Sequence, residues 1–122
     1  MPTPERGRIV LAEVSDPQRR NPKCRPLVII SATENIKPGE PILTVAVTGT
    51  FNRPLDSDCV ELPWHRDGRV QTELRMPCVA KCSWQQTIQQ ANIKAYKGLV
   101  PAKAMLAILK TTEALAQQQI DK

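Results

Sequence analysis

The feature that most constrains the fold is a series of short apolar runs, rich in β-branched residues and separated by proline, glycine or an aspartate–proline pair. Such runs are typical of β-strands, because β-branched side chains pack well on a pleated surface while proline and glycine begin turns. We therefore predict strands over residues 8–14, 27–32, 41–48, 59–62 and 78–84, with a last short strand over residues 93–100. Between them we expect a basic loop that runs to Arg25, a turn over residues 64–69 centred on Asp67 and Gly68, and a polar segment over residues 85–92 with at most one helical turn.

The end of the chain has the spacing of a helix rather than that of a strand. Pro101 suits the first position of a helix, where a missing backbone N–H costs nothing, and every residue from Ala102 to Gln119 is tolerated in one. Residues at helical spacing form one stripe, which consists of Ala102, Met105, Leu106, Leu109, Glu113 and Ala116. Glu113 is its one polar member, and Ile108 and Leu115 widen the stripe. Short strands followed by one helix predict a mainly β fold with a C-terminal helix, a partly closed antiparallel barrel of five to seven strands, built as a single domain over residues 1–122.

Basic side chains are gathered in two parts of a chain whose net charge is +5. One group is Arg19, Arg20, Lys23 and Arg25, and the other is Arg66, Arg69, Arg75 and Lys81. Basic clusters in loops favour a polyanionic partner. The same charges also suit an ordinary solvated surface, and composition alone slightly favours this second interpretation.

The composition argues against several other classes of protein. The four cysteines, at positions 24, 59, 78 and 82, and the one histidine lack the close pairing of a zinc site, so we predict no metal and no cofactor. No apolar run approaches the roughly 18 residues of a membrane helix, and residues 1–5 lack an apolar signal region. We therefore expect a soluble cytoplasmic protein, with no membrane partner, whose cysteines stay reduced.

Three segments form an ordered pattern along the chain. The first joins Arg-Gly-Arg-Ile-Val at 6–10 and Asp-Pro at 16–17 to Arg-Pro-Leu-Val-Ile-Ile at 25–30. The second is Val-Ala-Val-Thr at 45–48, and the third runs from Val-Ala-Lys-Cys at 79–82 through Thr-Ile at 87–88 to Gly-Leu-Val-Pro at 98–101. Their order and spacing resemble the PemK/MazF (Kid-like) toxins, which typically read Arg-Gly-Asp/Glu-Ile-Val, Asp-Pro and Arg-Pro-x-Val-Val-Ile, then an apolar strand ending in Ile-Thr, then Cys-Asp-Gln-x-Arg-Thr-Ile and Gly-x-Val. The resemblance extends from residue 6 to about residue 115.

This resemblance implies an SH3-like barrel related to the CcdB toxin, a homodimer, and single-stranded RNA held across the groove between the two protomers. It also implies sequence-selective, metal-independent endoribonuclease activity, and an acidic antitoxin segment that competes for the same groove. The chain departs from the family pattern at Arg8, where Asp or Glu is usual, at Ser83, where Asp is usual, and at Trp84, where Gln is usual. The loop after residue 17 is also shorter than usual and lacks the customary His or Glu with Gln. These departures remove candidate acid–base groups.

Cleavage of RNA without a metal uses the ribose 2′-OH as the nucleophile and needs a base, an acid and a cation that stabilises the phosphorane. Arg25 is the candidate cation, because its planar guanidinium matches two phosphate oxygens and stays charged, and because it occupies the position of the family's catalytic Arg. Thr48 is a candidate hydrogen-bond donor to a phosphate oxygen, on the strength of the resemblance. His65 is the third catalytic candidate, since histidine is the residue type that most often serves in acid–base catalysis near neutrality, although it lies outside the family's catalytic positions.

Further residues are predicted to bind RNA. Lys81 occupies the position of a family Arg, and Trp64 could stack a base on its indole. Ser83 is expected to contact RNA but cannot act as a base at neutral pH. The basic segment adds Arg19, Arg20 and Lys23. Structural interpretations stand beside these roles: a surface salt bridge for Arg25, a solvent-facing strand position for Lys81, and core packing for the tryptophans, which is favoured for Trp84.

Three functions follow from this pattern. The leading hypothesis is a toxin-type endoribonuclease of a toxin–antitoxin system. The alternative is a catalytically weak or inactive relative that binds nucleic acid or an antitoxin as a module. A third hypothesis, a CcdB-like gyrase poison acting through protein–protein contacts, needs no basic groove, and the basic segment from Arg19 to Arg25 argues against it.

Overall fold

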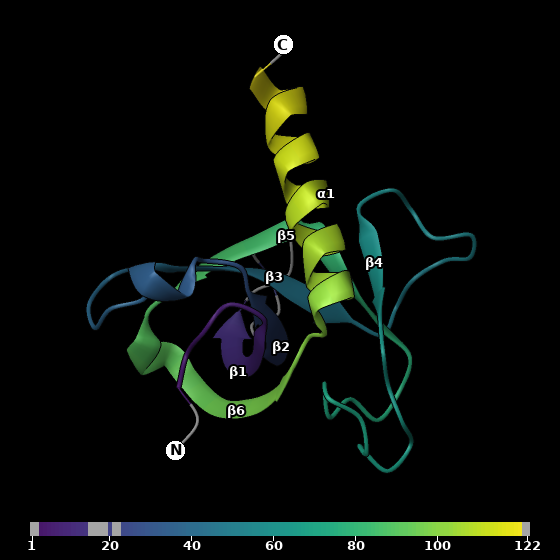
Figure 1. Cartoon of the computed structure of the whole chain (residues 1–122), viewed down its shortest axis with the longest axis horizontal. Coiled ribbons are helices and arrows are strands. Elements are labelled where there is room, and N and C mark those ends of the chain that lie inside the picture. Colours follow the sequence, from purple (N-terminus) through teal and green to yellow (C-terminus); the bar gives the residue numbers. More distant parts are fainter. Residues whose placement is uncertain (1–2, 15–19, 21–22, 121–122) are drawn as a thin grey trace.

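The computed structural model describes residues 3–14, 20 and 23–120, with side-chain surroundings as far as residue 117. Within this part of the chain, six strands precede one long helix: β1 (Arg8–Val14), β2 (Lys23–Ile29), β3 (Ile42–Thr48), β4 (Cys59–Leu62), β5 (Cys78–Ile88), β6 (Ile93–Leu99) and α1 (Ala102–Ile120). Two short 3₁₀ helices are η1 (Thr33–Asn35) and η2 (Gln90–Asn92). The predicted mainly β fold with a C-terminal helix is confirmed (Figure 1).

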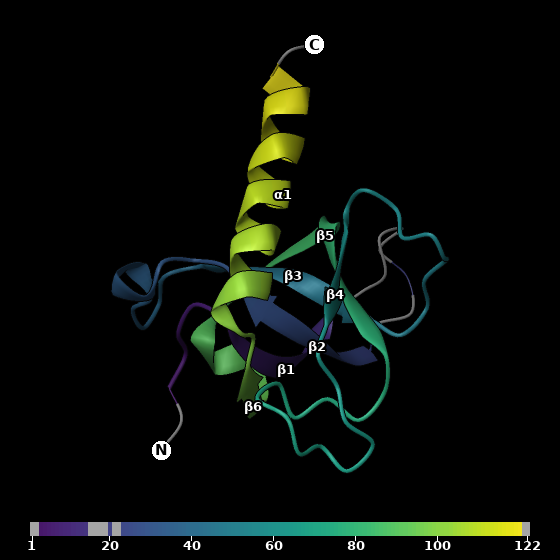
Figure 2. The same cartoon turned by 45° about the vertical axis from the view of Figure 1, so that its right-hand side comes forward.

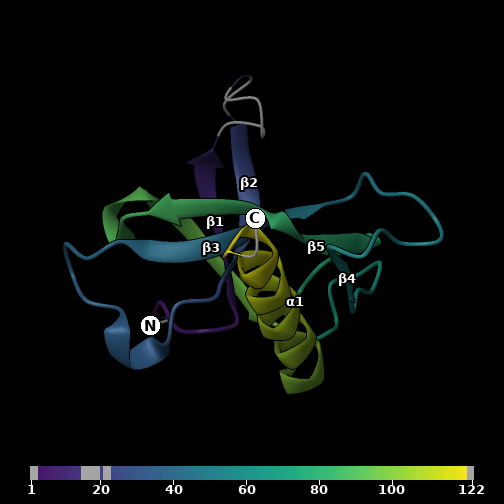
Figure 3. The same ribbon diagram turned by 90° about the horizontal axis from the view of Figure 1, so that it is seen from above.

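The strands form one antiparallel sheet in the order β4-β5-β3-β2-β1-β6. Seen from above, β2 runs across β3 and β5, as in a strongly twisted sheet that curls toward a barrel (Figure 3). The helix α1 contacts β4 and β5, and its C-terminal end extends away from the sheet (Figures 1 and 2). Within the described residues, no helix combines the length and the apolar character required to cross a bilayer.

Alternation along each strand divides the apolar residues between two cores on opposite faces of the sheet. The helix-side core joins Ile9, Val28 and Val45 to Met105 and Ile108 of α1. The second core lies on the other face, and its buried members are Val10, Ala12, Val14, Leu27, Ile29, Ile42, Ala46, Trp84 and Ile88. We call this other face the open face, because none of its core residues belongs to α1. The interpretation of Trp84 as a core residue is thereby confirmed.

The strand β2 begins earlier than its apolar run predicts. Residues 23–25, which we expected to lie in a loop, pair with β1, and the strand ends at Ile29 rather than at residue 32. Pro26 is tolerated because β2 has only one neighbour there: it pairs with Leu11 of β1, whereas the pairing with β3 starts at Leu27. The consequence is that Arg25 projects from a regular strand.

The strand β5 is longer than predicted, and the assignment of residues 85–88 to a non-strand segment is wrong. These residues pair with residues 42–45 of β3. Residues 85–87 are polar, so the sequence shows no apolar alternation there. The core residues of this part of β5 are Trp84 and Ile88, which lie on either side of the polar stretch. An irregularity lies between the two paired regions, since Val45 pairs with Gln85 but Ala46 pairs with Lys81. The helical turn expected in this region is the 3₁₀ helix Gln90–Asn92.

The long connection from β4 to β5 is held against β6 and contains the predicted turn. The turn is confirmed, with the N–H of Gly68 donating to the carbonyl of His65 at 2.7 Å. Farther along, the buried Thr72 hydroxyl donates to the Pro63 carbonyl at 2.7 Å. A glycine is required at position 98 of β6, because a Cβ there would lie 2.6 Å from the carbonyl carbon of Thr72. This close approach fixes where the loop that carries His65 runs.

Candidate functional site

The register of three neighbouring strands brings Arg25, Thr48 and Lys81 to one face. Leu27 of β2 pairs with Ala46 of β3, and Ala46 pairs with Lys81 of β5. Arg25 precedes Leu27 by two positions and Thr48 follows Ala46 by two, so alternation along each strand assigns both side chains to the face of Leu27 and Ala46. Paired residues of neighbouring strands share a face. All three side chains therefore belong to the open face.

Arg25 is stacked on an aromatic ring and forms no salt bridge with the residues that the structure describes. Its guanidinium carbon lies 5.0 Å from the centroid of the Trp84 ring, and Trp84 itself is only 8% exposed. The buried Nε of Arg25 and the buried indole Nε1 of Trp84 both lack a hydrogen-bond partner among the described residues. A flat aromatic support orients the guanidinium plane.

Thr48 ends β3 on the open face. Its Oγ1 accepts a hydrogen bond from the backbone N–H of Thr50 at 3.1 Å. Because the backbone amide uses a lone pair of the oxygen, the hydroxyl hydrogen of Thr48 is left for another acceptor. Alternation thus assigns a hydroxyl donor to the same face as the guanidinium.

Lys81 and Ser83 are joined by a residue that the sequence analysis did not select, Asp58. The Lys81 Nζ lies 3.5 Å from Asp58 Oδ2, and the Ser83 hydroxyl donates a short hydrogen bond to the same oxygen. The Ser83 hydroxyl is the largest influence holding the pKa of Asp58 below its ordinary value; burial opposes it and the Lys81 charge adds to it. Asp58 sits in a loop rich in turn-forming residues, and only the pairing of β4 with β5 shows that it reaches Lys81.

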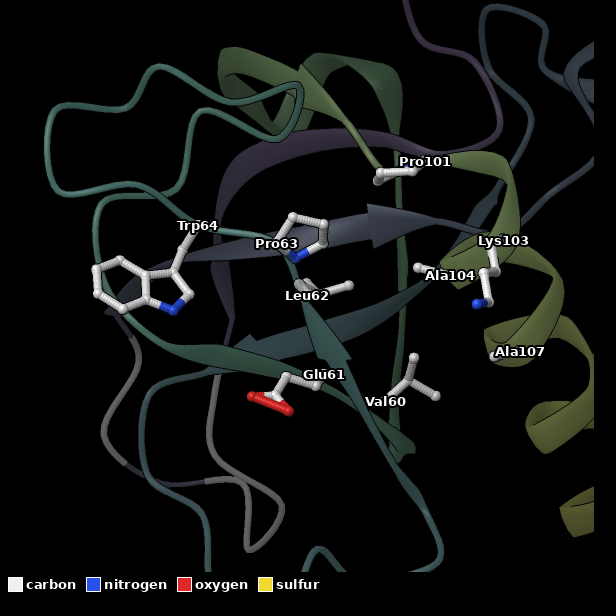
Figure 4. A pocket seen from close by; sticks show the side chains of 9 residues that line it. All are labelled: Val60, Glu61, Leu62, Pro63, Trp64, Pro101, Lys103, Ala104 and Ala107. Atoms are coloured by element: carbon white, nitrogen blue, oxygen red, sulfur yellow. The ribbon is translucent and has the colours of Figure 1, made fainter.

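His65 and Trp64 lie elsewhere. Trp64 is 44% exposed and lines an apolar groove of about 670 Å³ between β4 and the start of α1, together with Val60, Leu62, Pro101 and Ala104 (Figure 4). Val60 and Leu62 belong to the helix-side core. His65 is exposed in the next turn, where its Nδ1 accepts the N–H of Asp67 at 3.1 Å. The structure does not place either side chain with Arg25 on the open face.

The basic segment before Arg25 is described in part. Lys23 is exposed at the start of β2 and shares the face of Arg25 by alternation. Arg20 is exposed, whereas Arg19 lies outside the described residues.

One group of side chains has the spacing of metal ligands among the residues described. Asp56, Asp58 and Cys59 have potential ligand atoms within 4.8 Å of one another. Asp58 is occupied by Ser83 and Lys81, however, and burial followed by the nearby Asp58 charge raises the pKa of the Cys59 thiol. Metal binding needs a thiolate. This group is therefore poorly suited to a metal.

The sequence and the fold both match known proteins. The profile of the PemK-like, MazF-like toxins of type II toxin–antitoxin systems matches residues 5–116. A structure of MazE–MazF from Deinococcus radiodurans is similar with a TM-score of 0.72 at 15% identity, covering 96% of this chain and 98% of the other. An endoribonuclease from a mycobacterial species has a TM-score of 0.69 at 15% identity, covering 93% and 91% of the two chains.

A mycobacterial endoribonuclease in complex with its cognate antitoxin has a TM-score of 0.66 at 16% identity, covering 92% of this chain and 93% of the other. At these identities, the structural similarity establishes the fold. Among curated protein sequences, none matches the chain.

Proposed function

The chain belongs to the family of PemK-like, MazF-like toxins of type II toxin–antitoxin systems, and on this basis we propose that it is an endoribonuclease that cleaves single-stranded RNA. The observation that carries the proposal is the stack of Arg25 on Trp84, in which the cation has no acidic partner among the described residues. A guanidinium can bind two phosphate oxygens through parallel N–H···O hydrogen bonds. Thr48 and Lys81 on the same face would add a hydrogen-bond donor and a second charge.

The proposed reaction is an internal transfer of the phosphodiester. The ribose 2′-oxygen attacks phosphorus as its proton passes to a base, and the 5′-oxygen of the next nucleotide leaves and takes up a proton. The products are a 2′,3′-cyclic phosphate and a 5′-hydroxyl. Arg25 would stabilise the charge that develops on the phosphorane oxygens, with Thr48 donating to one of them.

The assembly and the partners extend this proposal. We propose a homodimer with RNA across the groove between protomers, since Leu106 of α1 is an exposed large apolar residue in this single chain. An acidic antitoxin segment would compete for the basic open face, in keeping with the antitoxin complex of the mycobacterial structure. The location would be the cytoplasm, where messenger RNA is translated.

A second function has an observation in its favour. His65 lies in the turn that follows Trp64, next to the apolar groove between β4 and α1. No histidine in the described part of the chain therefore stands beside Arg25. General acid–base catalysis ordinarily contributes roughly 10²- to 10⁴-fold. An RNA- or antitoxin-binding module with weak or no cleavage is therefore the alternative.

The deciding experiment incubates the purified protein with a long RNA in the presence of EDTA. The proposal predicts discrete fragments with 5′-hydroxyl ends, and the Arg25→Ala variant should leave the RNA intact. Arg53→Ala is the matched control, because Arg53 is an exposed arginine paired with Glu61 at 2.6 Å. RNA that is bound but stays whole in the parent protein would favour the binding module.

A further inference from the structure

The carboxylate of Asp58 is the common partner of two side chains from β5. It accepts the Ser83 hydroxyl hydrogen and pairs with Lys81 Nζ at 3.5 Å through one oxygen, while the Cys59 thiol lies 3.6 Å from the other. The Asp58 side chain is 16% exposed. Both oxygens thus have protein partners, and the carboxylate is largely withdrawn from solvent.

Backbone contacts hold Asp58 in place in addition to the contacts of its side chain. The Asp58 carbonyl accepts the backbone N–H of Cys82 at 2.8 Å, and the next residue, Cys59, is paired with Lys81 in the sheet. The carboxylate is therefore tied to the part of β5 that lies between Lys81 and Ser83. A lysine side chain has four rotatable carbon links, and a fixed partner restricts them.

We propose that Asp58 is a positioning residue that holds the Lys81 ammonium in one place beside β5, and that Ser83 influences RNA cleavage by fixing Asp58 rather than by contacting RNA. This inference rests on the proposed function. It replaces the separate roles that the sequence suggested for Lys81 and Ser83 with one connected unit, Ser83 to Asp58 to Lys81. The unit would fix the position of the Lys81 charge before RNA arrives.

A positioning role fits the chemistry of Asp58 better than proton transfer. The Ser83 hydroxyl, and to a lesser degree Lys81, holds the pKa of Asp58 below its ordinary value. A carboxylate so stabilised is a weak base, and its acceptor positions are already in use. Its negative charge also repels a phosphodiester, so the unit should assist turnover without strengthening RNA binding.

The opposite effects expected on turnover and on RNA binding provide the test. Asp58→Asn keeps the shape of the side chain and removes its charge, so kcat should fall about 10- to 100-fold while KM, and the affinity for an uncleavable 2′-deoxy analogue, stay equal or improve. Asp56→Asn is the matched control: it removes the same charge two residues away, has no contact with Lys81 or Ser83, and should leave kcat unchanged. Equal losses in affinity and kcat, or equal effects of the two variants, would overturn the inference.

Coupling and rescue give a second test. Ser83→Ala should lower kcat in the parent protein but not in the Asp58→Asn background, because both changes interrupt the same unit. Ser83→Asp in the Asp58→Asn background should restore part of kcat, since it returns a carboxylate beside Lys81. Additive losses without rescue would contradict the connection.

A readout without RNA separates this inference from the proposed function. The rate at which Lys81 is acylated, followed by mass spectrometry, should rise about two- to fivefold in Asp58→Asn and not in Asp56→Asn, as expected for the loss of a partly exposed ion pair. An unchanged rate overturns the positioning role. If the parent protein cuts no RNA but the acylation rate rises as expected, the proposed function fails while the ion pair that positions Lys81 stands.

Discussion

Arg25 and Lys81 are two cations of the open face with opposite surroundings. Arg25 lies on an indole and has no acidic partner in the described chain, whereas Lys81 is held by Asp58 at 3.5 Å. An uncompensated cation gains a full charge–charge interaction when a phosphate binds. A cation that already has a counter-charge gains less, but its position is fixed beforehand. The comparison suggests that Arg25 binds the phosphate and stabilises its developing charge, and that Lys81 helps to orient the phosphate.

The largest expected effect is that of removing Arg25, which has no acidic partner in the described part of the chain. Arg25→Ala should lower kcat by roughly 100- to 1000-fold, the usual cost of deleting a group that stabilises transition-state charge. Arg25→Lys should recover little, because an ammonium cannot make a bidentate contact. Single-turnover cleavage of a fluorescent RNA measures both. A folded Arg25→Ala protein that cuts at the parent rate would refute the site.

The next effect tests Thr48, the hydroxyl that alternation assigns to the same face as Arg25. Thr48→Ala should cost about tenfold in kcat, the equivalent of one hydrogen bond. Thr48→Ser keeps the hydroxyl and should stay close to the parent rate. If both variants lose activity equally, the threonine methyl, and not the hydroxyl, is what matters at the end of β3.

The salt dependence of RNA binding distinguishes the two cations directly. Affinity should fall steeply between about 50 and 200 mM salt, and Arg25→Ala should lower the slope by about 0.7, the value for one phosphate contact to a single strand. Lys81→Ala should lower it by less, because Asp58 already compensates that charge. Equal changes in slope would show that the ion pair opens when RNA binds.

A smaller effect concerns stability and pH. The pKa of Asp58 is lowered in the folded state, mainly by the Ser83 hydroxyl. Its contribution to folding is therefore complete above the unfolded value of about 4 and is lost as the pH falls through the lower folded value. The parent protein should be more stable than Asp58→Asn at pH 7, and this difference should shrink toward pH 3. Urea unfolding of both proteins across this range measures it, and a constant difference would contradict the shift.

The smallest effect is expected at the histidine that the sequence suggested for acid–base catalysis. His65 lies in the turn that follows Trp64, next to the apolar groove between β4 and α1 and not with Arg25. His65→Ala should therefore leave kcat and its pH profile unchanged. A loss of roughly 100-fold, the size of a general acid–base effect, would place the turn at the active site, for example through the partner protomer.

Much of the site could be predicted from the sequence because it lies on strands. The run of alternating residues after Pro41 predicts β3 with Thr48 at its end, and the resemblance at residues 25–30 points to Arg25. The boundaries of β2 and β5 were harder to predict. Lys23, Gln85 and Gln86 are polar, and only pairing with neighbouring strands makes those segments extended.

The sequence by itself determined the succession of strands and helix and the aliphatic core, because local alternation and turn residues act over a few neighbours. The candidate cation Arg25 came from its guanidinium chemistry and from the resemblance at residues 25–30. The tertiary structure decided which side chains meet. It stacked Arg25 on Trp84, joined Asp58 to Ser83 and Lys81, and separated Trp64 and His65 from them. These contacts depend on the register between strands that are distant along the chain, and register is set by the packing of both cores, which no local pattern contains.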